Sequence, residues 1–169
     1  MKKQLIIFSC LLLGALQSPA MHASQPVPNE QASISFTPPK GWKLADKKDL
    51  PPSVEFMVIG NGGQAFPPSI NLATEPFNGT MDDYLEIVKR INQENRSEWK
   101  KLGQVETKSG KAELSEATQI TQWGQIKMMH AMLIKNGRMH ILSTAASKDD
   151  FPKFYQEFFT AIRSLQIDD

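Results

Sequence analysis

Glycine-containing turns divide residues 105–145 into segments of strand character, and this pattern constrains the fold more than any other feature of the chain. Ser109-Gly110, Trp123-Gly124 and Asn136-Gly137 separate the segments. Asn-Gly is the strongest of these signals, because both residues accept the positive φ that a two-residue hairpin demands. We therefore predict an antiparallel meander with strands near Val105–Thr107, Lys111–Thr121, Gln125–Ile134 and Arg138–Ala145.

The Asn136-Gly137 turn also predicts a register for the last hairpin. A two-residue loop pairs His130 with Ser143 and His140 with Leu133. Successive strand residues point to opposite faces, so the two imidazoles should project from opposite faces of the sheet. A shared metal needs convergent ligands. We therefore interpret the two histidines as separately satisfied residues and expect no metal site.

Further strands and one helix are expected before the meander. Short apolar runs predict strands at Ile34–Phe36, Val54–Ile59 and Ser69–Thr74. Thr80 and Asp83 have the spacing of a capping box, in which each side chain satisfies an orphan backbone donor. Apolar residues then recur at helical spacing, which predicts an amphipathic helix with this inner stripe: Met81, Tyr84, Leu85, Val88 and Ile91.

A second helix is expected over Lys148–Leu165. Ser147 and Asp150 form another candidate capping box. Pro152 suits only the first turn of a helix, so the regular helix should begin a few residues later. An aromatic stripe follows, and we expect it to be core because exposing so much apolar area in one patch is unusual: Phe151, Phe154, Tyr155, Phe158, Phe159, Ile162 and Leu165.

The first 23 residues have the order of an export signal. Lys2 and Lys3 precede an apolar run, Leu5–Leu16, and small residues follow. We prefer cleavage after Ala23, with Ala20 as the alternative. The run is shorter than the roughly 20 residues that span a bilayer, so we expect no membrane segment to remain after cleavage. We expect no lipid anchor at Cys10, because cleavage before Cys10 would leave the apolar Leu11-Leu12-Leu13 in the mature protein.

Removal of the signal leaves a flexible leader, residues 24–33, and one domain, residues 34–169. Cys10 is the only cysteine, so the mature domain would hold neither a disulfide nor a thiolate site. The full chain has a formal charge of +1, and the signal carries only two of its lysines, so the domain is close to neutral. Nucleic-acid binding depends on a dense basic face, and we therefore expect no nucleic-acid partner.

The order of these elements resembles the PsbP-like family. That family includes the extrinsic photosystem II subunit, the Ran-release factor of the same fold and DcrB-type bacterial envelope proteins. The resemblance rests on order and spacing in these segments: Ile34–Trp42 (ISFTPPKGW), Thr80–Val88 (TMDDYLEIV), Ser109–Leu114 (SGKAEL), Lys135–Ala145 (KNGRMHILSTA) and the final Phe151–Leu165 helix. It implies an α+β domain, with an antiparallel sheet of about six strands and helices on both faces. It also implies a binding or assembly role without a catalytic residue or cofactor.

No reaction is indicated by the remaining motifs. Residues 60–65 match a dinucleotide fingerprint, but Phe66-Pro67-Pro68 cannot open the helix that should receive the pyrophosphate. No Gly-x-Ser-x-Gly elbow is present. The acidic pairs Asp82-Asp83 and Asp149-Asp150 lie at expected helix starts, where capping explains them. A hydrolase would need a deep pocket with convergent polar side chains, which only a structure can reveal.

We therefore expect a non-catalytic, exported bacterial envelope protein, periplasmic or secreted, that binds another envelope protein. Aromatic residues near turns are the candidate partner anchors: Trp123, Phe66, Trp99 and Trp42. The alternative is an exported carrier of a small apolar ligand. Its basis is the adaptable thioether side chains of one hairpin: Met128, Met129, Met132 and Met139.

Overall fold

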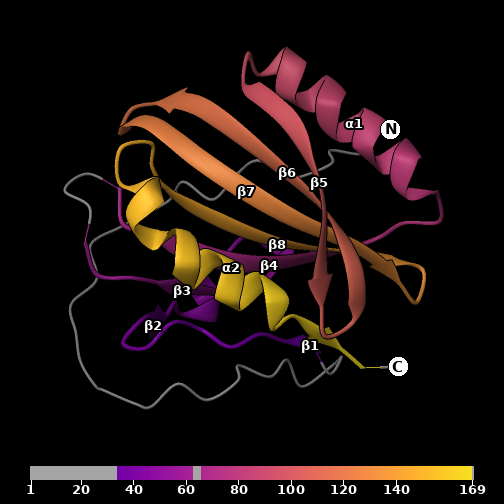
Figure 1. The fold of residues 1–169 in the computed structure, drawn as a ribbon, viewed down its shortest axis with the longest axis horizontal. Helices are drawn as coiled ribbons and strands as arrows, with labels where there is room; N and C mark the ends of the chain where they lie inside the picture. The colour runs from indigo at the N-terminus through magenta and orange to yellow at the C-terminus, as the bar shows by residue number, and fades with distance from the viewer. Residues whose placement is uncertain (1–33, 63–65, 169) are drawn as a thin grey trace.

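A seven-stranded antiparallel sheet forms the centre of the protein. The computed structural model describes residues 34–62 and 66–168. The expected signal peptide and leader, with Cys10, Ala20 and Ala23, lie outside the described residues. The sheet order is β2-β3-β4-β8-β7-β6-β5 (Figure 1). Its strands are β2 (Lys43–Leu44), β3 (Val54–Ile59), β4 (Ser69–Pro76), β5 (Glu98–Thr107), β6 (Gly110–Thr121), β7 (Gly124–Lys135) and β8 (Arg138–Ser147).

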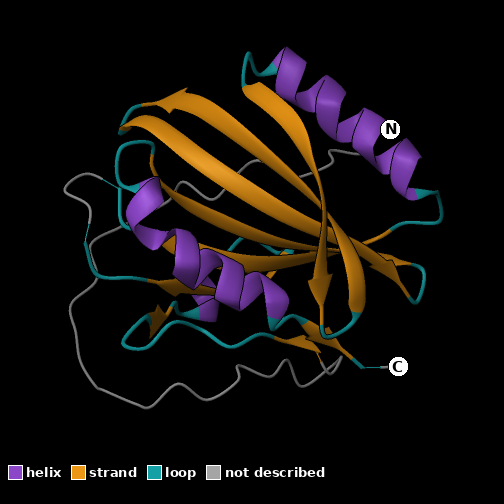
Figure 2. Cartoon of the chain, in the orientation of Figure 1, coloured by secondary structure: helices purple, strands orange, loops and turns teal. Residues whose placement is uncertain are grey.

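The two α-helices pack on opposite faces of this sheet (Figure 2). Helix α2 (Tyr155–Arg163) crosses one face, which we call the α2 face. Helix α1 (Met81–Glu94) packs at one corner of the other, the α1 face. The fold class predicted from the sequence is thus confirmed, with seven strands in the sheet rather than about six.

The last hairpin has the predicted register. Pairing of β7 with β8 places His130 opposite Ser143 and Leu133 opposite His140. Asn136 and Gly137 have φ values of 53° and 67°, the left-handed conformation that a tight two-residue turn requires. The expected antiparallel meander is therefore present as β5 to β8.

Helix α1 begins where the sequence predicts. Thr80 is its N-cap, the Thr80 Oγ1 accepts from the Asp83 N–H at 3.2 Å, and the Asp83 carboxylate accepts from the Thr80 N–H at 2.9 Å. Tyr84, Leu85 and Val88 are buried against the sheet. The capping box and the apolar spacing are both confirmed.

The C-terminal helix is shorter than the predicted span, Lys148–Leu165. The Ser147 Oγ accepts from the Asp150 N–H at 3.2 Å, but a turn and a 3₁₀ segment, η2 (Phe151–Phe154), come before α2. Pro152 explains this start, since it cannot donate the backbone hydrogen bond of a regular helix. Phe151, Phe158 and Ile162 are buried, whereas Tyr155 is 50% exposed.

Several elements of the structure differ from those predicted from the sequence. The first strand, β1 (Ile34–Ser35), pairs with β9 (Gln166–Ile167) in a separate two-stranded sheet beside the C-terminus. Another 3₁₀ turn, η1 (Lys47–Asp49), follows β2, and neither β2 nor β9 was predicted. Strand β5 begins at Glu98 rather than Val105, with a register shift between Lys101 and Gly103.

Candidate functional site

The α1 face carries two separate apolar clusters. The first, the α1 cluster, joins Tyr84, Leu85 and Val88 of the helix to Met132, Met139 and Ile141 of the sheet. The second lies at the β6–β7 hairpin end and is called the hairpin cluster. It contains Phe66, Ile126 and Ala145, with Trp123 and Met128 packed against it. The α2 face differs, because one continuous cluster extends from Ile34 to Ile167.

A row of polar side chains separates these two clusters. Asn71 of β4 pairs with Ser143 of β8, Ser143 pairs with His130 of β7, and His130 pairs with Ser115 of β6. Paired residues in antiparallel strands point to the same face, so these four side chains form a line across adjacent strands. We call them the polar row. Adjacent strands lie about 4.8 Å apart, so the row spans roughly 14 Å.

The polar row is largely enclosed and uncharged. Asn71, Ser115 and His130 are buried, and Ser143 is half-buried. The Ser143 Oγ lies 2.9 Å from the His130 Nδ1. Burial lowers the pKa of His130 to about 4, so its imidazole is neutral at pH 7.

Ser115 is the least satisfied member of the row. Its side chain is 0% exposed, and its Oγ has no hydrogen-bond partner among the described residues. A buried hydroxyl without a partner costs about 1–3 kcal/mol. The Ser115 hydroxyl is therefore a position at which a water molecule or a ligand could supply the missing hydrogen bond.

An ion pair closes the row at the edge strand. Lys101 of β5 is the cross-strand neighbour of Ser115, and its Nζ lies 3.1 Å from the Glu113 Oε2. The Gln104 Nε2 donates to the other carboxylate oxygen, Oε1, at 2.5 Å. The charge of Lys101 is therefore compensated within β5 and β6, and the row itself presents no net charge.

The Ser143–His130 pair has the separation of a nucleophile and a base, but it lacks the properties that catalysis requires. Burial lowers the pKa of this base to about 4, so it accepts a proton too weakly to act as a general base near neutral pH. An oxyanion hole needs free N–H donors. At Ser115, His130 and Ser143 the backbone lies inside paired strands. The arrangement therefore does not suit acyl transfer.

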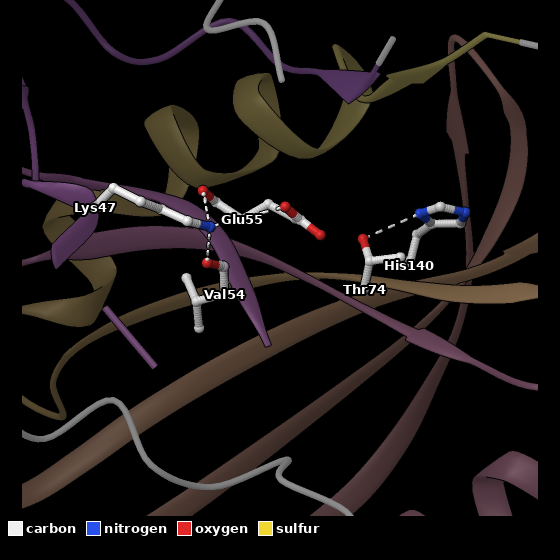
Figure 3. Close-up of polar contacts among 5 residues, drawn as sticks. All are labelled: Lys47, Val54, Glu55, Thr74 and His140. Atoms are coloured by element: carbon white, nitrogen blue, oxygen red, sulfur yellow. Dashed lines mark hydrogen bonds and ion pairs between the residues drawn. The ribbon is translucent and has the colours of Figure 1, made fainter. Parts of the chain in front are cut away.

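A second set of polar contacts lies near β3 and at the β4–β8 pair (Figure 3). The Lys47 Nζ donates to the carbonyl oxygens of Val54 and Glu55 at 2.8 and 2.9 Å. The His140 Nδ1 lies 3.4 Å from the Thr74 Oγ1, and its Nε2 lies 3.3 Å from a backbone carbonyl. His140 is thus held at both nitrogens, and burial lowers its pKa. The two histidines project from opposite faces, as the register predicts.

The structure brings together two of the four aromatic anchors predicted from the sequence. Phe66 is buried, and the half-buried Trp123 packs on it with ring centroids 6.4 Å apart. Trp42 lies on the other face, edge-on to Phe154 and Phe158 of the C-terminal helix. Trp99 packs into the α1 cluster. Only Trp123 and Phe66 therefore border the polar row's face at its hairpin end.

The methionines of the predicted carrier site are also divided between the faces. Met128, Met132 and Met139 lie on the α1 face, whereas Met129 belongs to the continuous core of the α2 face. Met57, which sequence reasoning missed, pairs with Asn71 and so lies on the α1 face beside the polar row. Thioether side chains thus flank the row along the strands and at its β3 end.

Within residues 34–62 and 66–168, no group of three His, Cys, Asp or Glu side chains converges as a metal site would require. No helix of the same ranges has the length and apolarity to cross a bilayer.

Comparison by sequence finds no match, either to a protein-family profile or to a characterised protein. Comparison by structure does. CyanoP, the cyanobacterial PsbP of Synechocystis, matches with a TM-score of 0.62 and 13% identity, over 92% of this chain and 99% of that one. LpqN of Mycobacterium tuberculosis, involved in cell envelope biogenesis, matches at 0.57 and 11% identity, over 86% and 91% of the two chains.

The Saccharomyces cerevisiae Ran-binding protein Mog1p matches at 0.53 and 11% identity, over 85% of this chain and 90% of that one. None of these three proteins is described as an enzyme. Identities this low establish the fold alone. The chain has the PsbP-like fold, as its sequence resemblance implies.

Proposed function

We propose that this protein is an exported, non-catalytic module of the bacterial cell envelope that binds another envelope protein. The fold is shared with CyanoP and with LpqN, which is involved in cell envelope biogenesis. The N-terminal signal pattern favours the same compartment. The enclosed, weakly basic Ser143–His130 pair supports binding rather than a reaction.

The observation that carries the proposal is the exposed apolar surface at the β6–β7 hairpin end. Ile120 is 79% exposed there, and Trp123 is half-buried on Phe66. Large apolar side chains at a protruding hairpin are suited to insertion into a partner, and tryptophan is enriched among residues that dominate binding energy. The partner surface is therefore assigned to Ile120 and Trp123.

A pull-down after mild crosslinking in the native envelope tests the assignment. We expect Ile120→Ser and Trp123→Ala to lose a partner that the wild-type protein captures. Leu44→Ser is the matched control, because Leu44 is also exposed, at 58%, but lies on the edge strand β2, separated from β7 by β3, β4 and β8. Equal recovery with Ile120→Ser and Leu44→Ser would contradict the assigned surface.

Export is tested separately by sequencing the N-terminus of the protein from an envelope fraction. Cleavage after Ala23, or after the alternative Ala20, is the expected result. Recovery of the intact chain in the cytoplasm would contradict the envelope location.

A second candidate function is carriage of a small ligand, favoured by the methionines on the α1 face. Met57, Met128 and Met132 surround the polar row, and methionine adapts to irregular ligands. Native mass spectrometry of the protein purified from its host should then show a bound population. An unliganded mass for the whole population would argue against carriage.

A further inference from the structure

We infer that the polar row binds a small, uncharged ligand that carries hydroxyl groups, such as a neutral sugar. The inference rests on the second candidate function, ligand carriage. The sequence alone predicts an apolar ligand, whereas the polar row points to a ligand with hydroxyl groups. The row consists of Asn71, Ser143, His130 and Ser115 on four adjacent strands.

The row selects against charge. Asn and Ser carry none, and burial keeps the His130 imidazole neutral near pH 7. Among the described residues, Lys101 is the cation whose strand position is next to Ser115, and it is paired with Glu113. A charged ligand bound at the polar row would lose its hydration without gaining a counter-charge, which is strongly unfavourable. A neutral ligand avoids that loss.

The row selects for hydroxyl groups by its hydrogen-bonding capacity. Serine hydroxyls, the asparagine amide and a neutral imidazole can each donate and accept. A ligand hydroxyl has the same dual capacity, so it can pair with any member of the row. The Ser115 Oγ, buried without a partner among the described residues, is the position at which such a hydroxyl supplies the missing hydrogen bond.

The surroundings suit the carbon skeleton of such a ligand. Ser143 and Met128 are half-buried, whereas Asn71, Ser115 and His130 are buried, so the proposed ligand approaches the row from the side of Ser143 and Met128. Met128 precedes His130 by two residues on β7 and therefore lies one step along the same face. Trp123 lies beyond it at the hairpin, against Phe66. A thioether and then an aromatic ring thus follow the polar groups along the strand direction.

Methionine-methyl NMR of the purified protein provides an internal control. Maltose, a neutral disaccharide, is the probe, and maltobionate is its acidic counterpart. We expect maltose to shift the Met128 methyl resonance and leave Met129, on the opposite face, unchanged. Maltobionate should bind more weakly. Equal shifts at the two methionines, no shift at Met128, or stronger binding of maltobionate would each overturn the inference.

Two serine variants separate binding from folding. Ser115→Ala removes a hydroxyl that has no described partner, so the urea midpoint should stay the same or rise. Maltose affinity should fall about fivefold, the factor for one hydrogen bond of about 1 kcal/mol. Ser53→Ala is the matched control, because the Ser53 Oγ is also buried with no partner in the described part of the chain but lies outside the row, just before β3.

Ser115→Ala and Ser53→Ala should therefore differ in affinity and not in stability. Unchanged maltose affinity in Ser115→Ala would overturn the inference. A purely apolar ligand found by native mass spectrometry, with no Met128 shift on adding maltose, would also overturn it while leaving carriage intact. An unliganded mass together with no maltose binding would contradict both ligand carriage and the inference about the polar row.

Discussion

Replacing Phe158 by alanine should destabilise the protein more than any other single change in the C-terminal helix. Phe158 is 0% exposed and lies in the continuous core of the α2 face. Its ring centroid is 5.0 Å from that of Phe151 and 6.1 Å from those of Phe154 and Trp42. Removing the ring therefore leaves a cavity among aromatic neighbours and does not merely expose surface.

The magnitude follows from that environment. Truncation of a buried phenylalanine costs about 3–5 kcal/mol. Aromatic pairs add about 0.5–1.5 kcal/mol each beyond their buried area, which places Phe158→Ala near the upper half of that range. With a urea dependence of about 2 kcal/mol per molar, a loss of about 4 kcal/mol lowers the unfolding midpoint by roughly 2 M.

The matched control lies on the same helix. Tyr155 is 50% exposed and stacks on Phe159 with ring centroids 4.7 Å apart, so Tyr155→Ala should shift the midpoint much less. Urea unfolding of the wild-type protein and both variants, followed by circular dichroism, measures the difference. A Phe158→Ala midpoint no lower than that of Tyr155→Ala would refute the reasoning, because the stripe would then be a binding surface rather than core.

Three further predictions concern a cap, a turn and a buried imidazole. Thr80→Ala breaks the capping box with Asp83 and should cost about 1 kcal/mol, whereas Thr80→Ser should not; equal urea midpoints for the two variants would contradict this. Gly137→Ala should lower the free energy of unfolding by roughly 1–2 kcal/mol, because φ is +67° at this position. The added Cβ would meet only an ordinary van der Waals contact, so the cost comes from the backbone conformation; an unchanged thermal midpoint would contradict it. The pKa of His130 is lowered from about 6.5 in the unfolded chain to about 4 in the folded protein, so the unfolded state binds the extra proton between these values. Stability should therefore be fully present above pH 6.5 and fall by on the order of 3 kcal/mol as pH drops towards 4. The lowered pKa of His140 acts in the same direction, and His130→Gln should make the pH dependence shallower; a slope as steep as that of the wild-type protein would contradict the assignment.

The parts of the fold that the sequence predicts are those whose signals are local. The Asn136-Gly137 turn determines the register of the last hairpin because two residues define the loop. The capping box and apolar spacing locate α1. Pro152 predicts the late start of α2, because proline lacks the required N–H group.

The elements that were missed have weak local signals. Strands β2 and β9 are two residues each, too short for a periodic pattern. The first part of β5 is an edge strand with exposed Glu98, Lys100 and Lys101, and a register shift interrupts its alternation. Such polar edges protect a sheet against further pairing, and the same property conceals the strand in the sequence.

Three of the four residues of the polar row were accessible to sequence reasoning. The two-residue loop between β6 and β7 implies a register that places Ser115 opposite His130. The hairpin register already pairs His130 with Ser143. Asn71 could not have been added, because β4 meets β8 across α1 and three intervening strands. Nothing local specifies a pairing so distant along the chain.

The two faces of the sheet differ in how continuously their apolar side chains pack. One continuous cluster on the α2 face joins both ends of the described domain, including β1 and β9. We expect this larger cluster to contribute most of the stability, since apolar burial is the dominant favourable term in folding. The α1 face contains a polar interruption between two apolar clusters, where apolar residues would stabilise more. Truncations such as Phe158→Ala on the α2 face should therefore lower stability first, whereas Ser115→Ala on the α1 face should change binding at nearly constant stability. The α1 face is thus interrupted by uncharged polar groups, and one of them, the Ser115 Oγ, has no partner among the described residues; this interruption is why we propose that the α1 face binds a ligand.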